Sequence, residues 1–369
     1  MIEGSKNKGD WGEFYALLYL LAKGKIYSAD EHLNEISSYY FPIIRIMRDE
    51  KHKKTNITNH MDYVISTQNG IDTIDIYMDS RLMQTKTAQE FQDEVDKLSV
   101  DIPLGRGRQF TIPHGENFLN SIYLERLAAP STEVTDIKVE VRDTNTARNQ
   151  EMGFSIKSYL GGAPTLLNAS GATNFVYEVI GLTQTQKDQV NAINTRSKII
   201  DRIAQIETFG GSLEFRHAEN STFSSNLMMV DSCMEKIISE MLLYYYQTNT
   251  KDCNAIVQFM ETSNPLRYPR EGMYEYKFKK FLCAKALGMD PSKEWGGMDE
   301  ANGGYIAVKS DGNVLAYFLY DRNKFEKYLL DNTHFERAST RKFGFASIYD
   351  EGGRMYMKLN LDIRFYDNH

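Results

Sequence analysis

An aspartate and a lysine, Asp136 and Lys157, lie in two segments that alternate apolar and polar residues, which predicts two strands. A polar turn over 145–150 separates the segments, so the strands should pair as an antiparallel hairpin. Centring the pairing on this turn places Lys138 opposite Lys157, and Asp136 about two residues, roughly 7 Å, from the level of Lys157. Asp143 would lie about five residues, roughly 17 Å, away from that level. The spacing therefore selects Asp136 over Asp143 as the partner of Lys157.

A carboxylate and an ammonium group held in this way could act on a phosphodiester. The carboxylate is a ligand for Mg²⁺, which prefers oxygen ligands and keeps several waters. Such an ion polarises a phosphodiester and lowers the pKa of an attacking water. The ammonium group can neutralise charge that builds up in the transition state, or orient the water. The alternative is a plain hairpin with a solvated polar face, and alternation and charge alone favour that alternative.

Three parts of the chain resemble a known family. The segments TDIKVEV (135–141) and GFSIKS (153–158) resemble the PD-(D/E)xK arrangement of restriction endonucleases. The continuation YLGGAPTLLNAS (159–170), with TNF at 173–175, is similar to the HpaII family of type II restriction enzymes. The opening NKGDWGE (7–13) and the closing stretches FERASTR (335–341) and KLNLDIRF (358–365) resemble that family too. The central block is specific for this family, whereas a DxK pattern alone would not be.

Two positions depart from the motif of the resembling enzymes. Thr135 stands where proline is usual, and Ser155 stands where an acidic residue would supply a metal ligand. Some nucleases of this superfamily take that carboxylate from elsewhere, and Glu13, on the helix expected before the core sheet, is the best replacement here. A capping box with Asp10 as N-cap and Glu13 at the third helical position would explain the same glutamate without any function. The weaker substitutes are Glu178 and Glu151.

Other polar residues could contact nucleic acid. Two arginines in a glycine-containing loop could follow a phosphate backbone, and polar residues just after the second strand stand where DNA contacts are expected. Basic residues before the last hairpin could reach phosphates or guanine edges. Solvated loops, a polar turn or a solvated surface explain each group equally well, as they do the lysines of the predicted helix 274–287. The candidates are Arg106 and Arg108; Asn168, Ser170, Thr173 and Asn174; and Arg337, Arg341 and Lys342.

Composition excludes several classes of protein. The 369 residues are 41% hydrophobic and 25% charged, ordinary values for a globular protein. No apolar run approaches the ~18–20 residues of a membrane span, and the N-terminus lacks a signal-peptide pattern. Three cysteines without a CxxC pair indicate a reducing, cytoplasmic location and argue against a disulfide framework or zinc site. The net charge of -7 counts against a surface that binds nucleic acid everywhere, but a cleft needs positive charge only along its walls.

Helical and strand patterns are mixed along the whole chain, which predicts an α/β (α+β mixed) protein. Given the resemblance, we expect a restriction-endonuclease-like core, a central mixed sheet flanked by helices, within one integrated nuclease. Residues 1–100 would hold N-terminal helices and a hairpin, 101–220 the catalytic core, and 221–369 a region for DNA recognition or dimer contacts. Helices are predicted at 10–22, 29–49, 87–98, 116–127, 187–208, 227–246, 274–287 and 323–330, and hairpin turns at 69–70, 145–150, 311–312 and 351–353.

The resemblance implies a Mg²⁺-dependent type II restriction endonuclease that cuts duplex DNA at CCGG and leaves 5′-phosphate and 3′-hydroxyl ends. Asp136 and Glu13 would bind the metal, and Lys157 would stabilise charge or position water. Ser155 would be the fourth catalytic residue, at the motif position where an acid is usual. A symmetric target suits a homodimer, although successive nicking by a monomer gives the same product. The cell would also need a companion cytosine methyltransferase.

Three rival functions remain open. The chain could be a nuclease of the same superfamily with a different short target, or an inactive DNA-binding relative, because Ser155 replaces an acid. A metabolic α/β enzyme ranks last, since neither GxGxxG nor GxxxxGK[ST] is present.

Overall fold

The computed structural model describes residues 6–51, 57–129, 135–144, 146–337 and 345–367. Helices and strands are mixed along the described part of the chain, so the expected mixed α/β class is confirmed. The chain forms two compact units, one from Met1–Pro164, Asp299–Tyr328 and Asp367–His369, the other from Thr165–Met298 and Leu329–Tyr366. Within the described ranges, no helix is both long and apolar enough to cross a membrane.

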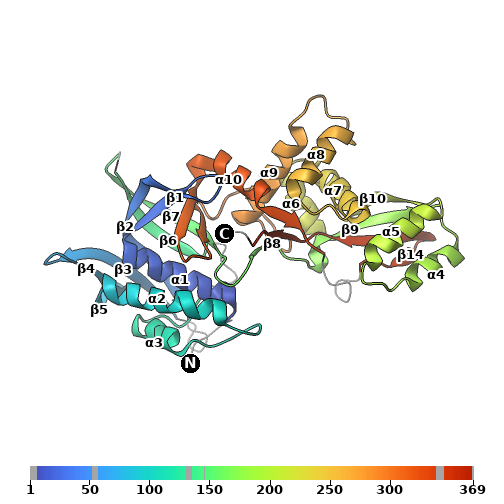
Figure 1. The fold of residues 1–369 in the computed structure, drawn as a ribbon. Coiled ribbons are helices and arrows are strands. Elements are labelled where there is room, and N and C mark those ends of the chain that lie inside the picture. The colour runs from blue at the N-terminus through green and yellow to red at the C-terminus, as the bar shows by residue number, and fades with distance from the viewer. Residues whose placement is uncertain (1–5, 52–56, 130–134, 145, 338–344, 368–369) are drawn as a thin grey trace. The chain divides into compact units, whose positions relative to one another are not determined.

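The first unit is built on a nine-stranded sheet in the order β1-β12-β11-β7-β6-β2-β3-β4-β5. Strand β1 pairs with β12 and also with β2, so six of these strands close into a ring from which β3, β4 and β5 extend (Figure 1). The elements are α1 (Lys8–Lys23), β1 (Lys25–Ala29), β2 (Glu35–Lys51), β3 (Thr58–Gln68), β4 (Ile71–Met78), β5 (Arg81–Thr87), α2 (Ala88–Leu104), α3 (Pro113–Ser121), β6 (Ile137–Asp143), β7 (Arg148–Ser158), β11 (Gly304–Val308), β12 (Val314–Phe318), the 3₁₀ turn η2 (Leu319–Asp321) and α10 (Arg322–Asp331), which runs into the second unit.

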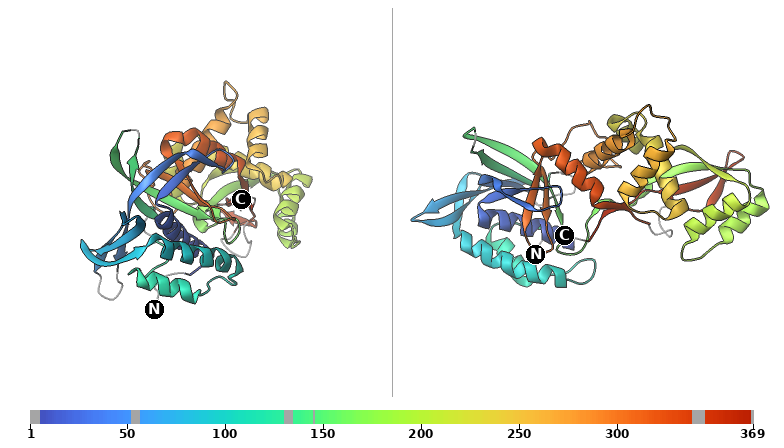
Figure 2. Two further views of the ribbon diagram at one scale, coloured as in Figure 1. Left: turned by 60° about the vertical axis from the view of Figure 1, so that its left-hand side comes forward. Right: turned by 45° about the horizontal axis from the view of Figure 1, so that its top comes forward.

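Helix α1 is buried on nearly every side, as its apolar residues predict. It ends at Gly24, whose φ of 63° is the left-handed conformation that favours glycine. Helices α1 and α2 run side by side in Figures 1 and 2. Phe14 of α1 and Leu98 of α2 join Val139 of β6 and Phe154 of β7 in one hydrophobic core. The core thus holds α1 against the strands that carry the polar residues of interest.

The predicted hairpin forms, but its predicted register was wrong. Lys138 pairs with Gly153 instead of Lys157, a shift of four residues (157 minus 153). The cause is the turn: β6 continues to Asp143 and pairs it with Arg148, so the connection is shorter than the polar stretch that we took as the turn. Because strand pairing puts Asp136 beside Ser155, Asp136 still lies two positions from Lys157 along β7.

The predicted helix over 29–49 was also wrong, because this stretch forms the end of β1 and most of β2. Its aromatic and β-branched residues, such as Phe41, Ile43 and Ile46, fit a half-buried strand. Pro42 lies next to a register shift between Ile43 and Arg45, where a strand tolerates proline. The hairpins at 69–70, 311–312 and 351–353 are confirmed.

The second unit has a four-stranded sheet in the order β10-β9-β15-β14 and a three-stranded sheet in the order β13-β16-β8. The predicted helical blocks 187–208 and 227–246 are each interrupted, so that four helices form there. The elements are β8 (Thr165–Leu167), the 3₁₀ turn η1 (Gly171–Thr173), β9 (Asn174–Ile180), α4 (Gln184–Ala192), α5 (Lys198–Thr208), β10 (Ser212–Ala218), α6 (Ser221–Val230), α7 (Met234–Thr248), α8 (Cys253–Ser263), α9 (Met273–Ala286), β13 (Thr333–Phe335), β14 (Ile348–Glu351), β15 (Arg354–Asn360) and β16 (Ile363–Phe365).

Candidate active site

Asp136 is held against β7 by three hydrogen bonds. Its backbone N–H donates to the carbonyl of Phe154 at 2.9 Å. Its Oδ2 accepts the backbone N–H of Ile156 at 2.6 Å and the hydroxyl of Ser155 at 3.3 Å. Ser155 is therefore a buried donor that orients Asp136, in the place where the motif has an acid. The carboxylate therefore lies against Ser155 and Ile156, the two residues that precede Lys157 on β7.

Glu13 comes to the same strand because α1 packs unusually close to it. A Cβ atom on Gly12 would lie 2.2 Å from Cβ of Ser158, the last residue of β7, so only glycine permits this approach. The expected capping box of Asp10 and Glu13 was wrong: Asn7 is the N-cap, and it exchanges hydrogen bonds with Asp10. Capping therefore does not account for Glu13, which lies inside the helix.

The three groups are electrostatically linked. Burial raises the pKa of the Glu13 carboxyl well above its usual range, and the nearby Asp136 carboxylate raises it further, against Lys157 and Arg48. Burial also raises the pKa of Asp136, although Lys157, the N–H of Ile156, Ser155 and Arg48 partly offset it. Two carboxylates that repel each other beside an ammonium group favour an added positive charge between them.

Lys157 is half-buried on β7, whose neighbour β11 pairs Ala307 with it. No carboxylate of the described residues comes within ion-pair distance of its ammonium group, although the charge influences both Glu13 and Asp136.

Arg48 is the residue that sequence reasoning missed. It lies on β2, where a helix had been predicted, and its positive charge acts on both carboxyls of the site. No motif marks it, because only the pairing of β2 with β6 brings it near Asp136.

The other acidic candidates lie elsewhere. Asp143 is at the far end of the hairpin, where it accepts the hydroxyl of Thr146 at 2.7 Å. Glu151 is exposed and pairs with Arg45 at 3.4 Å. Glu178 is on β9 of the second unit and forms ion pairs there with two arginines. Glu13 is therefore the only one of the three substitutes, Glu13, Glu151 and Glu178, whose contacts link it to Asp136 and Lys157.

Mg²⁺ fits these donors. Two carboxylates supply hard oxygen ligands, and Mg²⁺ keeps several waters of its own, so it does not need an all-protein cage. In the described part of the chain, no three or more His, Cys, Asp or Glu side chains gather as a metal site. Asp136 and Glu13 are the residues that would hold the ion.

Two of the DNA-binding candidates, Asn168 and Arg337, lie in the second unit at one end of the three-stranded sheet, beside Asp362. Asn168 follows β8, Arg337 follows β13, and Asp362 precedes β16. Antiparallel pairing of these strands brings all three ends together. The carbonyl of Asp362 accepts the N–H of Glu336 at 2.9 Å, and its carboxylate accepts the N–H of Ala169. Segments far apart in the sequence are therefore neighbours here.

Arg337 and Arg364 provide positive charge at this sheet end. Arg337 is half-buried and donates to Oδ1 of Asn249 at 2.8 Å. Nε of Arg364 lies 2.6 Å from the Glu336 carboxylate, and its side chain is 41% exposed. Arg364 stands in a segment that resembles the family, but it was not among the predicted contacts. The other two basic candidates, Arg341 and Lys342, lie outside the described residues.

Ser170, Thr173 and Asn174 serve an internal network next to that sheet end. Ser170 caps the 3₁₀ turn η1, while Thr173 and Asn174 are fully buried. The side-chain amide of Asn360 donates to both Ser170 and Asn174 at 2.7 Å. A direct contact of Thr173 or Asn174 with DNA would require this network to open, whereas Asn168 is exposed.

Arg106 and Arg108 are exposed in the loop after α2. This loop lies along the start of α1, because the Lys8 ammonium donates to Pro103 and the Trp11 indole donates to Phe110. Both arginines therefore lie near the beginning of the helix that carries Glu13.

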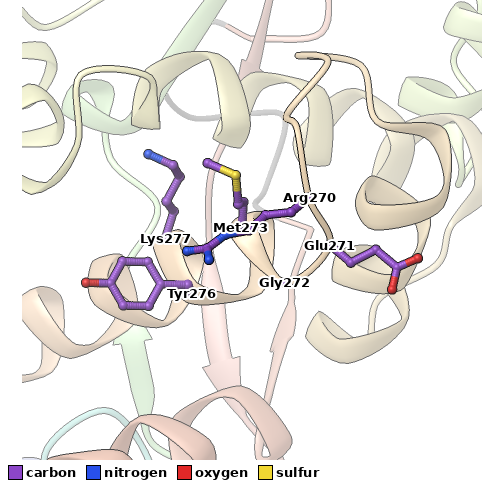
Figure 3. Close-up of a pocket in the computed structure, with 6 residues that line it drawn as sticks. All are labelled: Arg270, Glu271, Gly272, Met273, Tyr276 and Lys277. Carbon is purple, nitrogen blue, oxygen red and sulfur yellow. The ribbon is translucent and has the colours of Figure 1, made fainter.

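The lysine-rich helix α9 borders a cavity of about 370 Å³ (Figure 3). Lys277 forms an ion pair with Asp231, and Lys279 forms one with Glu275. Lys280 lies over the ring of Tyr276, 5.0 Å from its centre. Each of these three lysines thus contacts a side chain of the protein itself. The lining residues are Arg270, Glu271, Gly272, Met273, Tyr276 and Lys277.

Comparison with known proteins defines the class. The profile of the HpaII restriction endonuclease family matches residues 7–365, so the chain belongs to this family and is a site-specific deoxyribonuclease. Over 365 residues the chain is 38% identical to the type II restriction enzyme HpaII of Haemophilus parainfluenzae, which covers 98% of each sequence. No solved structure matches the chain.

Proposed function

We propose that this restriction endonuclease uses Mg²⁺ to cut duplex DNA at CCGG, leaving 5′-phosphate and 3′-hydroxyl ends. The observation that carries the proposal is the meeting of Glu13, Asp136 and Lys157 at the end of β7, with both carboxyl pKa values raised. The similarity to a relative named HpaII supports the choice of target. We also propose that β6, β7 and α1 belong to a restriction-endonuclease-like core.

The chain's own residues would divide the work at the site. Asp136 and Glu13 hold Mg²⁺, which when bound polarises the scissile phosphate and lowers the pKa of water. Ser155 and the N–H of Ile156 keep the Asp136 carboxylate oriented. Lys157 neutralises the charge that develops on the phosphate oxygens or orients the attacking water.

Digestion of a plasmid with several CCGG sites tests this proposal. With Mg²⁺ present, we expect a fixed set of fragments whose sequenced ends all map to CCGG, and no fragments with EDTA. Ends at another short sequence would identify a nuclease of different specificity. Mobility shifts without any cut strand, even at excess enzyme, would identify an inactive DNA-binding protein.

We propose a homodimer, because a symmetric target suits a two-fold symmetric protein. We place it in the cytoplasm, where a companion cytosine methyltransferase would protect the cell's own sites.

We further propose that the sheet end with Asn168 and Arg337 contacts DNA, together with Arg106 and Arg108 of the first unit. Arginine is the usual reader of guanine edges, and Arg337 lies at this sheet end. Asn168 and the loop arginines are exposed, so they can reach a ligand without rearrangement.

Arg337→Ala should weaken binding of a CCGG duplex by about 10- to 100-fold, the effect of losing one good base contact. Fluorescence anisotropy with Ca²⁺ in place of Mg²⁺ measures this without cleavage. Asn249→Ala removes the same internal hydrogen bond but keeps the arginine, and Arg354→Ala removes an arginine that pairs with Glu178 on another hairpin. Both controls should bind within about 3-fold of wild type, well below the effect of one base contact. Unchanged binding by Arg337→Ala would remove Arg337 from the interface.

A further inference from the structure

Arg48, a side chain outside the motif, makes three hydrogen bonds to backbone carbonyls and one ion pair. Its Nη2 donates to the carbonyls of Arg126 and Ala128 at 2.9 and 2.8 Å, and its Nη1 donates to that of Leu127 at 3.2 Å. Its Nε lies 2.8 Å from Oε1 of Glu50, and the side chain is only 10% exposed. One guanidinium thus binds three consecutive carbonyls of the segment that follows α3.

The next residue of the same segment binds the candidate metal ligand. The backbone N–H of Ala129 donates to Oε2 of Glu13 at 3.2 Å. Ala129 directly follows the three residues whose carbonyls Arg48 binds. Arg48 and Glu13 are therefore connected through a short, continuous stretch of backbone.

The chemistry of arginine suits this task. Its planar guanidinium has five donors in a fixed fork, so it fixes the relative positions of several acceptors, whereas lysine offers a point charge. Glu50 compensates the buried charge and itself accepts the N–H of Glu125, at the other end of the same segment. The segment is thus held from both ends by two side chains of β2.

A second attachment of this loop does not involve Glu13. The hydroxyl of Tyr63 on β3 donates to the carbonyl of Ile122 at 2.9 Å. Tyr63 is fully buried and anchors the beginning of the loop, close to the end of α3. It offers a matched comparison, because its loss loosens the loop away from Ala129.

We propose that Arg48 is a positioning residue for cleavage: it holds residues 126–128 so that the N–H of Ala129 fixes the Glu13 carboxylate for metal binding. The inference rests on the proposed role of Glu13 as a metal ligand. Residues that orient a ligand are expected to matter almost as much as the ligand itself, about 10- to 100-fold in metal affinity or activity.

The test compares Arg48→Met, Arg48→Lys and Tyr63→Phe in the full chain. Binding of Mn²⁺, followed by electron paramagnetic resonance without DNA, should weaken about 10-fold or more in Arg48→Met and by a smaller factor in Arg48→Lys. Single-turnover cleavage should fall in the same order, while DNA affinity in Ca²⁺ stays within about 2-fold. Tyr63→Phe should lower the melting temperature but leave Mn²⁺ affinity unchanged. An equal loss of affinity in Tyr63→Phe would indicate general loosening and overturn the proposal.

A double-mutant cycle with Glu13→Gln decides whether Arg48 acts through Glu13. In that background, Arg48→Met should cause no further loss of Mn²⁺ affinity. The same fold loss in both backgrounds would show that Arg48 acts independently and overturn the proposal. If Glu13→Gln alone binds Mn²⁺ and cleaves like wild type, the proposed ligand fails instead. If circular dichroism shows Arg48→Met unfolded, Arg48→Lys carries the test, and wild-type affinity in that variant contradicts the proposal.

Discussion

Asp136→Asn and Lys157→Met should each lower the single-turnover cleavage rate by about 10³-fold or more, because each removes several kcal/mol of transition-state stabilisation. Asp136→Asn removes the charge of the proposed metal ligand but keeps a side chain that fits between Ser155 and Ile156. Lys157→Met keeps the length of the side chain and removes only its charge. Binding of a CCGG duplex in Ca²⁺ should remain close to wild type for Lys157→Met, as measured by anisotropy.

Controls for both variants lie on the same hairpin. Asp143→Asn changes an aspartate at its far end, and Lys138→Met changes an exposed lysine on β6. Both should cleave at nearly the wild-type rate. Substantial cleavage by Asp136→Asn or Lys157→Met would mean that the chemistry takes place elsewhere in the molecule.

Glu13→Gln should give the second large effect, a loss of at least about 10²-fold in cleavage with Mn²⁺ binding weakened in parallel. Since burial raises the pKa of the Glu13 carboxyl, this group must lose a proton before it binds a metal. Metal affinity of the wild type should therefore rise with increasing pH, through and above the range where an ordinary glutamate is already ionised. In Glu13→Gln this dependence should be weaker.

Glu151→Gln is the matched control, since Glu151 was a rival for the same role and lies exposed on the hairpin. We expect it to keep wild-type Mn²⁺ affinity, measured by electron paramagnetic resonance across the pH series. If Glu151→Gln and not Glu13→Gln weakens Mn²⁺ binding, the second carboxylate of the site, beside Asp136, has been assigned to the wrong element.

The sequence predicted the two strands of the hairpin correctly and their register wrongly. Alternation identified both strands, and the predicted pairing together with the motif pointed to Asp136 and Lys157. The predicted register was wrong because a stretch of polar residues does not define where the strands end and the turn begins. The separation of two positions between Asp136 and Lys157 survived because the shift moved Asp136 from one side of Lys157 to the other along β7.

Non-local contacts account for what sequence reasoning missed. The stretch that contains Arg48 has apolar residues that fit either a helix or a strand, and only pairing with β1, β3 and β6 decides for β2. The capping explanation of Glu13 failed because the helix begins at Lys8, with Asn7 and not Asp10 as its N-cap. Ser155 was recognised as a missing acid, but its role as a donor to Asp136 needs the observed pairing.

The ring of strands in the first unit has a consequence for synthesis of the enzyme. β7 carries Lys157, but its neighbour β11 begins only at Gly304, after the chain has passed through most of the second unit. A chain emerging from the ribosome therefore contains Glu13, Asp136 and Lys157 long before β11 and β12 can complete the sheet around them. Nascent and prematurely terminated chains lack the closing strands, so the cell's DNA meets an assembled nuclease only when translation is nearly finished.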